Sequence, residues 1–201
     1  MPDQSLQNLI SLRLSPRQAV ASKMFYVDTQ GMNNTQIGCS VRIKPEIQRG
    51  ITVLKITPGG NDYYFPYVQG VGEVSVGATN NIPEGTIAVT GGMNGCALEA
   101  TVKNNQFVFY HDQNGRCMNG VRNAGRTVCR ITEASYWPQN IQMMQHQYPI
   151  IQFISVYRNS FWHVVCFGLF TDGRHSVNGG FEPLGGRYRG YFNDNIKLMQ
   201  R

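Results

Sequence analysis

A cysteine behind a glycine-rich turn and a histidine on the segment that follows are the residues of this sequence best suited to chemistry. The turn runs from Thr90 to Cys96 with the sequence Thr-Gly-Gly-Met-Asn-Gly-Cys, and His111 follows fifteen residues after the cysteine. Catalysis by a cysteine nucleophile with a general base requires at least a thiol and an imidazole or a similar basic group. The pattern therefore predicts Cys96 as the nucleophile and His111 as its base.

The spacing places this pair on the two strands of one hairpin. The segments before and after Asn104-Asn105 are rich in aromatic and β-branched residues, and asparagine tolerates the positive φ of a two-residue turn. With those two residues as the loop, His111 lies opposite Leu98. Cys96 is two residues from Leu98 on the same strand and shares its face. We therefore expect Cys96 and His111 to be diagonal neighbours on one face of a sheet.

Neighbouring residues can complete such a site. Backbone N–H groups in the turn at Asn94 and Gly95 can point at a developing oxyanion. A histidine base works best when its second nitrogen is held by an acceptor. Thr90 ends a predicted strand and can supply that acceptor with its hydroxyl or its carbonyl oxygen. Asp112 ranks behind Thr90, because strand alternation points it away from His111.

The remaining cysteines and histidines are interpreted as structural or incidental. No two of them have the close spacing of a zinc site, so we expect neither a metal nor a cofactor. An odd number of cysteines without a framework predicts free thiols in a reducing compartment. These residues are Cys39, Cys117, Cys129, Cys166, His146, His163 and His175.

Composition excludes several classes of protein. The chain has 201 residues, of which 41% are hydrophobic, and its net charge is +6. No apolar run is long enough to span a membrane, and the first twenty residues lack the core of a signal peptide. The basic residues are spread along the chain without an RNA-binding aromatic motif, so we expect no nucleic-acid partner. This length predicts a single domain over residues 1–201.

Hydrophobic spacing predicts a helical start followed by strands. Leu6, Leu9 and Ile10 follow helical spacing, and Ser15-Pro16 is typical of a cap with proline at the first helical position. A second helix is predicted from Ser135 toward Pro149, and 179–189 is expected to be a loop or the rim of a site. Two apolar runs around Asn159-Ser160 favour a second hairpin.

The pattern predicts an α+β fold, with a mixed, largely antiparallel β-sandwich core flanked by helices and long loops. The expected strands cover residues 37–43, 51–57, 63–67, 86–90, 97–103, 106–111, 127–131, 150–157 and 161–170.

At the cysteine turn the sequence resembles the bacterial glutamine deamidase toxins, namely the catalytic domain of the cytotoxic necrotizing factors and the Burkholderia lethal factor. The shared pattern is Gly95-Cys96 followed by His111 on the next strand, at the separation seen in the necrotizing factors. Thr90 matches a threonine of the lethal-factor triad and of the chemoreceptor deamidases. Residues 64–70 are similar to an aromatic-Leu-Pro-Trp-x-Gln-Gly segment upstream of the lethal-factor cysteine. The chain departs from the family at Asn94, where serine is common.

The resemblance implies a hydrolase that converts a glutamine side chain of a host protein to glutamate. Family targets are Rho-type GTPases and a translation-initiation helicase. It also implies a virulence effector, secreted by a bacterium, that acts in the host cytoplasm, and we expect it to act as a monomer. Two alternatives remain open: another cysteine amidase or peptidase, and a non-catalytic β-rich binding module.

Overall fold

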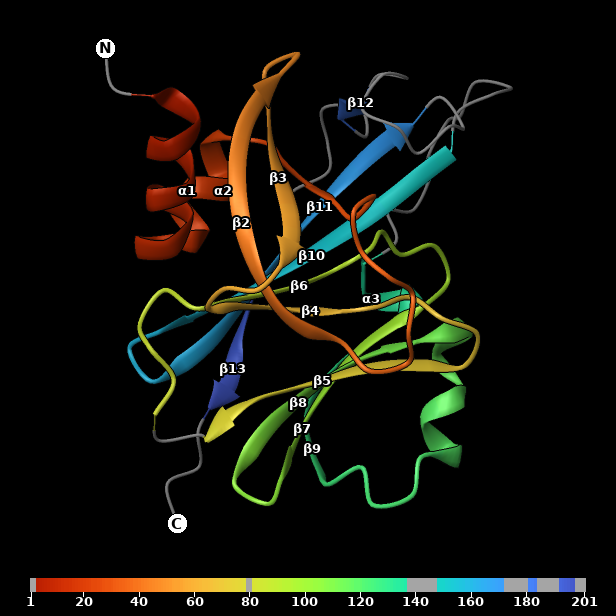
Figure 1. The fold of residues 1–201 in the computed structure, drawn as a ribbon. Helices are drawn as coiled ribbons and strands as arrows, with labels where there is room; N and C mark the ends of the chain where they lie inside the picture. Colours follow the sequence, from red (N-terminus) through yellow and green to blue (C-terminus); the bar gives the residue numbers. More distant parts are fainter. Residues whose placement is uncertain (1–2, 79–80, 137–147, 172–180, 184–191, 198–201) are drawn as a thin grey trace.

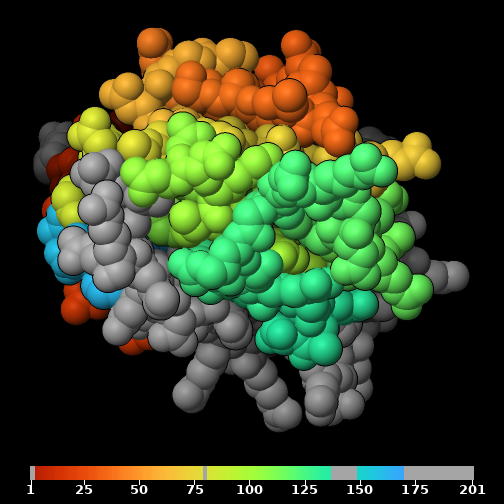
Figure 2. All heavy atoms as spheres, turned by 90° about the horizontal axis from the view of Figure 1, so that it is seen from below, coloured from red at the N-terminus to blue at the C-terminus, as the bar shows by residue number. Residues whose placement is uncertain are grey.

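Two β-sheets and a pair of N-terminal helices make up the described part of the chain (Figure 1). The computed structural model describes residues 3–78, 81–136, 148–171, 181–183 and 192–197. The large sheet has the strand order β1-β3-β2-β4-β6-β10-β11-β12, with β13 also paired to β11, and the small sheet has the order β5-β8-β7-β9. Seen from below, the strands of the small sheet and the turns that follow them cover much of one face (Figure 2).

The strands differ in length and are joined by both tight turns and longer loops. In the large sheet they are β1 (Phe25–Asp28), β2 (Cys39–Gln48), β3 (Ile51–Pro58), β4 (Asp62–Phe65), β6 (Ile87–Thr90), β10 (Tyr148–Arg158), β11 (Phe161–Thr171), β12 (Phe181–Pro183) and β13 (Phe192–Lys197). In the small sheet they are β5 (Val71–Ala78), β7 (Ala97–Lys103), β8 (Gln106–Asp112) and β9 (Arg126–Ile131).

Two helices cover part of the large sheet. Helix α1 (Gln4–Leu14) begins at Asp3, whose side chain accepts a hydrogen bond from the backbone of Ser5. Helix α2 (Pro16–Ser22) follows Ser15, with proline at its first position as predicted. Their buried residues pack in one cluster with β1, β3 and β6. Tertiary packing of this apolar face stabilises helices that are too short to be stable alone.

The large sheet curls back on itself. Gln152 of β10 donates a hydrogen bond from Nε2 to the carbonyl oxygen of Val27, at 3.2 Å, and its Oε1 accepts one from the Val27 amide. These bonds join β1, at one edge of the sheet, to β10 far along the strand order, which protects an otherwise open edge. The expected α+β class holds in its broad form. The fold is mostly β and partly barrel-like, so the expected sandwich does not describe it well.

Both predicted hairpins are confirmed. Asn104 and Asn105 have φ of 49° and 60°, and their strands pair with Leu98 opposite His111. Asn159 and Ser160 have φ of 51° and 65° between β10 and β11. Pairing is antiparallel except for β1 with β3 and β4 with β6.

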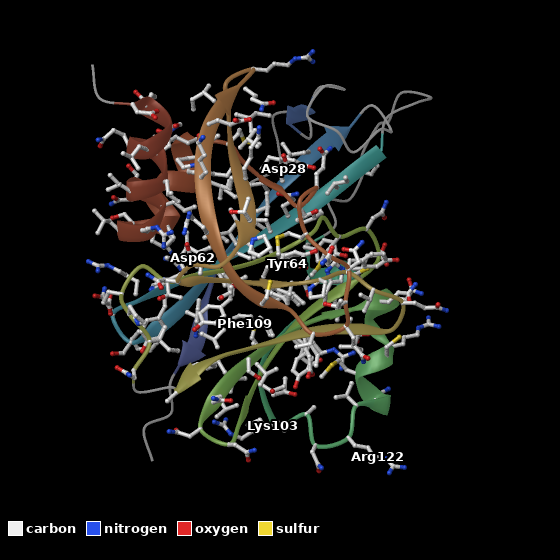
Figure 3. The ribbon with its side chains drawn as sticks, in the orientation of Figure 1. Asp28, Asp62, Tyr64, Lys103, Phe109 and Arg122 are labelled. Carbon is white, nitrogen blue, oxygen red and sulfur yellow. The ribbon has the colours of Figure 1, made fainter. Side chains whose placement is uncertain are left out.

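An aromatic core fills the space between the sheets. Phe109 of β8, labelled in Figure 3, packs against Trp162 of β11 with ring centroids 4.9 Å apart, and its ring centroid lies 5.7 Å from that of Phe65 of β4. All three are fully buried. Since His111 has the same strand parity as Phe109, its side chain also faces this layer between the sheets.

The sequence interpretation differs from the structure in several elements. It missed β1, β5, β12 and β13. The expected helix from Ser135 is wrong at its start, because α3 (Glu133–Tyr136) already contains that residue. The remainder of that helix, His146, His175 and most of the expected loop at 179–189 lie outside the described residues. Among the described helices, none is long and apolar enough to cross a membrane.

Candidate active site

Thr90 and His111 come from different sheets and meet between them. Thr90 ends β6 and His111 lies near the end of β8, and both are fully buried. The Thr90 hydroxyl oxygen lies 2.7 Å from His111 Nδ1. When Nδ1–H donates to that hydroxyl, Nε2 carries the free lone pair of the ring. The contact fixes the orientation of the imidazole ring, and the acceptor role predicted for Thr90 corresponds to this tautomer.

His111 is held as a neutral imidazole. Burial lowers its pKa from 6.5 to about 3. Its Nε2 has no hydrogen-bond partner among the described residues. The Tyr67 ring covers it, with ring centroids 5.1 Å apart, and Tyr67 itself is 44% exposed. A buried nitrogen without a partner costs stability, so Nε2 is available to a proton donor that enters the site.

Cys96 lies on the same face of the small sheet as His111. It precedes β7, two residues from Leu98, which pairs with His111. It also belongs to the cluster of buried side chains between the two sheets. Among the described contacts, no hydrogen bond joins its sulfur to the imidazole. In enzymes, hydrogen bonds between catalytic groups are often long before substrate binds, and here both side chains lie on one face of the sheet.

The thiol is protonated in the resting site. Burial raises the pKa of Cys96, while the backbone amides of Asn114 and Asn94 act in the opposite direction. No imidazolium lowers the pKa of the thiol in this state, because burial disfavours the charged form of both groups. The site therefore rests as a neutral thiol and a neutral imidazole.

The turn before Cys96 is anchored to β10. Met93 exchanges two backbone hydrogen bonds with Ile151, of 2.7 and 3.0 Å, and its side chain is fully buried. Gly95 has φ of +84°, which favours glycine. A Cβ on Gly92 would lie 2.1 Å from the Ile150 side chain. These constraints fix the position of the cysteine and explain two glycines of the motif, Gly92 and Gly95.

Three residues missed by sequence reasoning contribute to the site. The Tyr136 hydroxyl donates to the Cys96 carbonyl oxygen at 2.7 Å. Asn114, in the 3₁₀ turn η1 (Gln113–Gly115), brings its amide to the thiol from the end of β8. Tyr67 lies in residues 64–70, whose resemblance to the toxins was noted, but its position over His111 depends on pairing between distant strands.

Cys96 reaches solvent through a cavity of about 480 Å³. The thiol residue is only 5% exposed, so it lies at the base of this space. Most lining groups are uncharged amides, hydroxyls and aromatic rings. Figure 3 labels two of the residues that line the cavity, Tyr64 of β4 and Asp28 of β1. The lining residues are Tyr26, Val27, Asp28, Thr29, Gln30, Asn34, Tyr64, Tyr67, Gly91, Gly92, Asn94, Cys96, Pro149, Ile150 and Gln152.

The other titratable groups form no second centre in the described residues. No group of three or more His, Cys, Asp or Glu could hold a metal ion there. No disulfide bond joins any two of Cys39, Cys96, Cys117, Cys129 and Cys166. His163 has its Nε2 3.2 Å from the carbonyl oxygen of Arg158, at the end of the β10–β11 hairpin.

His111 is expected to make the fold sensitive to acid. Its folded pKa of about 3 lies below the value of 6.5 for an exposed histidine. Its contribution to stability is therefore present above pH 6.5 and is lost as pH falls toward 3, by about 1.4 kcal/mol per pH unit. Denaturant unfolding at several pH values should show a weaker pH dependence for His111→Gln than for the wild type. Equal dependence would contradict the buried neutral imidazole.

Thr90→Val should impair the site without dismantling it. The substitution keeps the shape of the side chain but removes the hydroxyl on His111 Nδ1. One neutral hydrogen bond is worth roughly 1 kcal/mol, so we expect about a fivefold loss of activity. The measurement is the initial rate of substrate turnover. Thr90→Ser retains a hydroxyl and should restore most of the rate. A wild-type rate in Thr90→Val would leave Thr90 with a packing role only.

Comparisons with known proteins identify no family. No protein-family model matches the sequence, and no curated protein matches it. Among solved structures, the chain is similar to the C-terminal domain of CNFy from Yersinia pseudotuberculosis, with a TM-score of 0.38 and 10% identity. The match covers 73% of this chain and 66% of that one, just under two thirds of it. Likeness at this level establishes neither a shared fold nor a shared activity.

Proposed function

We propose that this protein is a cysteine-dependent glutamine deamidase that acts on another protein. The observation that carries the proposal is the 2.7 Å contact between the Thr90 hydroxyl oxygen and His111 Nδ1. The His111 side chain lies on the face of the small sheet that also bears Cys96. Nucleophilic attack on an amide requires an oriented base and a thiol that can be reached from solvent, and here the two groups share a sheet face and the cysteine lines a cavity. The resemblance of the cysteine turn to the deamidase toxins supports the same reaction.

The first half of the reaction forms a thioester. As the substrate carboxamide enters, the Cys96 thiol passes its proton to His111 Nε2, and the sulfur attacks the carboxamide carbon. The carbonyl oxygen becomes an oxyanion, which the backbone amides of Asn94 and Asn114 beside the sulfur can stabilise. His111 then gives its proton to the nitrogen, and ammonia leaves. The substrate glutamine is now joined to Cys96 as a thioester.

The second half of the reaction releases glutamate. His111 Nε2 takes a proton from water, and the hydroxide attacks the thioester carbon. The carbon–sulfur bond breaks, and the thiolate of Cys96 regains the proton from His111. A neutral imidazole with Nδ1 held by Thr90 has its Nε2 lone pair available in both halves, so it needs no preceding deprotonation step.

The burial of the thiol favours a side-chain amide over a peptide bond. Cys96 is 5% exposed, within a cavity that is lined by the turn at 91–96 and by rings of Tyr64 and Tyr67. A glutamine carboxamide projects from the main chain on a slim, flexible stem and can reach such a recessed atom. A peptide bond carries chain on both sides and needs a more open approach. This geometry supports deamidation over peptide cleavage.

The substrate and setting are proposed from the resemblance. We infer a host protein as substrate, of the Rho-type GTPase or translation-initiation helicase kind, and a secreted bacterial effector that acts in the host cytoplasm. The chain would act as a monomer and without a cofactor, because the proposed reaction needs only the thiol, the imidazole and water.

Incubation with a host-cell extract tests the proposal. Wild-type protein and Cys96→Ser are incubated with equal amounts of extract, and tryptic peptides are searched by mass spectrometry for glutamine converted to glutamate. We expect a small set of sites that convert only with the wild type. New peptide termini instead of converted glutamines would indicate a peptidase. Identical extracts, together with stable capture of a partner, would indicate a binding module.

A further inference from the structure

Asp28 is the one charged side chain among the described residues that line the cavity of Cys96. It ends β1 and is 8% exposed. Its Oδ1 accepts a hydrogen bond of 3.0 Å from the Gln30 amide, which fixes the carboxylate at the start of the loop after β1. The proposed reaction does not use this carboxylate.

Among the described residues, no cation forms an ion pair with Asp28. Lys55 is its partner in the β1–β3 register, but Lys55 Nζ instead bonds Glu46 Oε1 at 2.8 Å. The hydrogen bond to Glu46 and, to a smaller extent, the charge of Asp28 raise the pKa of Lys55, so Lys55 offsets part of the Asp28 charge from a distance. The charge acts on its surroundings: burial and the nearby Asp28 together raise the pKa of Tyr26, another lining residue, to about 12. A charge in a cavity with low-dielectric walls interacts more strongly with entering groups than one on an open surface.

We propose that Asp28 determines specificity by making the cavity favour uncharged amides and cations over carboxylates. A target glutamine would then be preferred where a lysine or arginine neighbours it, and disfavoured in an acidic segment. The glutamate product would be repelled, which assists its release. The choice of a glutamine substrate rests on the proposed function, whereas the charge selection rests on the cavity alone.

Alkylation of Cys96 by two matched reagents tests this selection without requiring enzymatic activity. Iodoacetamide and iodoacetate have the same leaving group and differ by carboxamide against carboxylate, the same difference that separates glutamine from glutamate. The rate at each cysteine is followed by mass spectrometry of its peptide, at low salt. Cys39 is exposed and outside the cavity, so it serves as an internal reference for each reagent.

In the wild type, we expect the ratio of the iodoacetate rate to the iodoacetamide rate to be lower at Cys96 than at Cys39. Asp28→Asn keeps the size of the side chain and an oxygen for the Gln30 amide. It should raise the ratio at Cys96 roughly threefold to tenfold, as expected for removing one nearby charge. Glu133→Gln removes the same charge from an exposed position outside the cavity and should leave the ratio unchanged.

The salt dependence of the ratio is a second measurement, which can be made on the wild type and then compared with Asp28→Asn. Added sodium chloride should raise the ratio at Cys96 in the wild type and have less effect in Asp28→Asn. An unchanged ratio in Asp28→Asn would overturn the inference, and so would an equal shift in Glu133→Gln. If the wild type deamidates proteins in extract but the alkylation ratio at Cys96 is unchanged in Asp28→Asn, only the role of Asp28 is refuted. A shifted ratio without any deamidation in extract refutes only the proposed function.

Discussion

Replacement of Cys96 by serine is expected to lower the rate of glutamine deamidation on the order of 10⁴-fold or more, the usual cost of removing a catalytic nucleophile. The alcohol is similar in size to the thiol but far harder to deprotonate. The buried imidazole is too weak a base to compensate for this difference in acidity. The rate is measured as conversion of the target glutamine by mass spectrometry over time.

Two controls separate lost chemistry from lost structure. Cys39→Ser removes an exposed thiol and should retain the wild-type rate. Cys96→Ser should unfold at the same temperature as the wild type, because its neighbours at Gly95 and Met93 are held by backbone interactions. Full activity in Cys96→Ser would remove this residue from the mechanism.

His111→Gln is expected to lower the deamidation rate by roughly 10²-fold to 10⁴-fold, the contribution of a positioned general base. Glutamine can still hydrogen-bond the Thr90 hydroxyl, so the link between the two sheets can persist. It cannot take the proton of the thiol or deliver one to ammonia. Initial rates at saturating substrate measure this effect on the chemical steps.

His163→Gln is the matched control for this substitution. His163 is the other histidine among the described residues, and it lies on β11 with its Nε2 near the carbonyl oxygen of Arg158 rather than on the strand of His111. Its replacement should leave the rate within a factor of about two, as is usual for a substitution away from the reacting groups. A wild-type rate in His111→Gln, or an equal loss in both variants, would contradict the assigned base.

The contacts that are local in sequence could be predicted. The Asn104-Asn105 turn fixes the register of β7 and β8, and strand alternation then places Cys96 on the face of His111. Ser15-Pro16 marks the start of α2 in the same way. In each case the residue types restrict φ directly, so a few residues decide the geometry.

The contacts between distant segments were harder to predict. The Thr90–His111 contact was anticipated as a chemical need, but its position between two separate sheets depends on how β6 and β8 pack. Tyr136, Asn114 and Tyr67 reach the site only through tertiary structure. β5 was missed because glycine and serine interrupt its apolar alternation. The neutral state of the thiol and the imidazole follows from burial, which spacing along the chain does not reveal.

The central claim is that Cys96 is a nucleophile activated by His111 and reached through the cavity. The most direct measurement is the labelling rate of Cys96 by a glutamine analogue that carries a chloroketone in place of the carboxamide. We predict that Cys96 reacts faster than the exposed Cys39 despite its burial, and that His111→Gln removes this advantage. Labelling of Cys96 that is slower than that of Cys39, or unaffected by His111→Gln, would contradict the account.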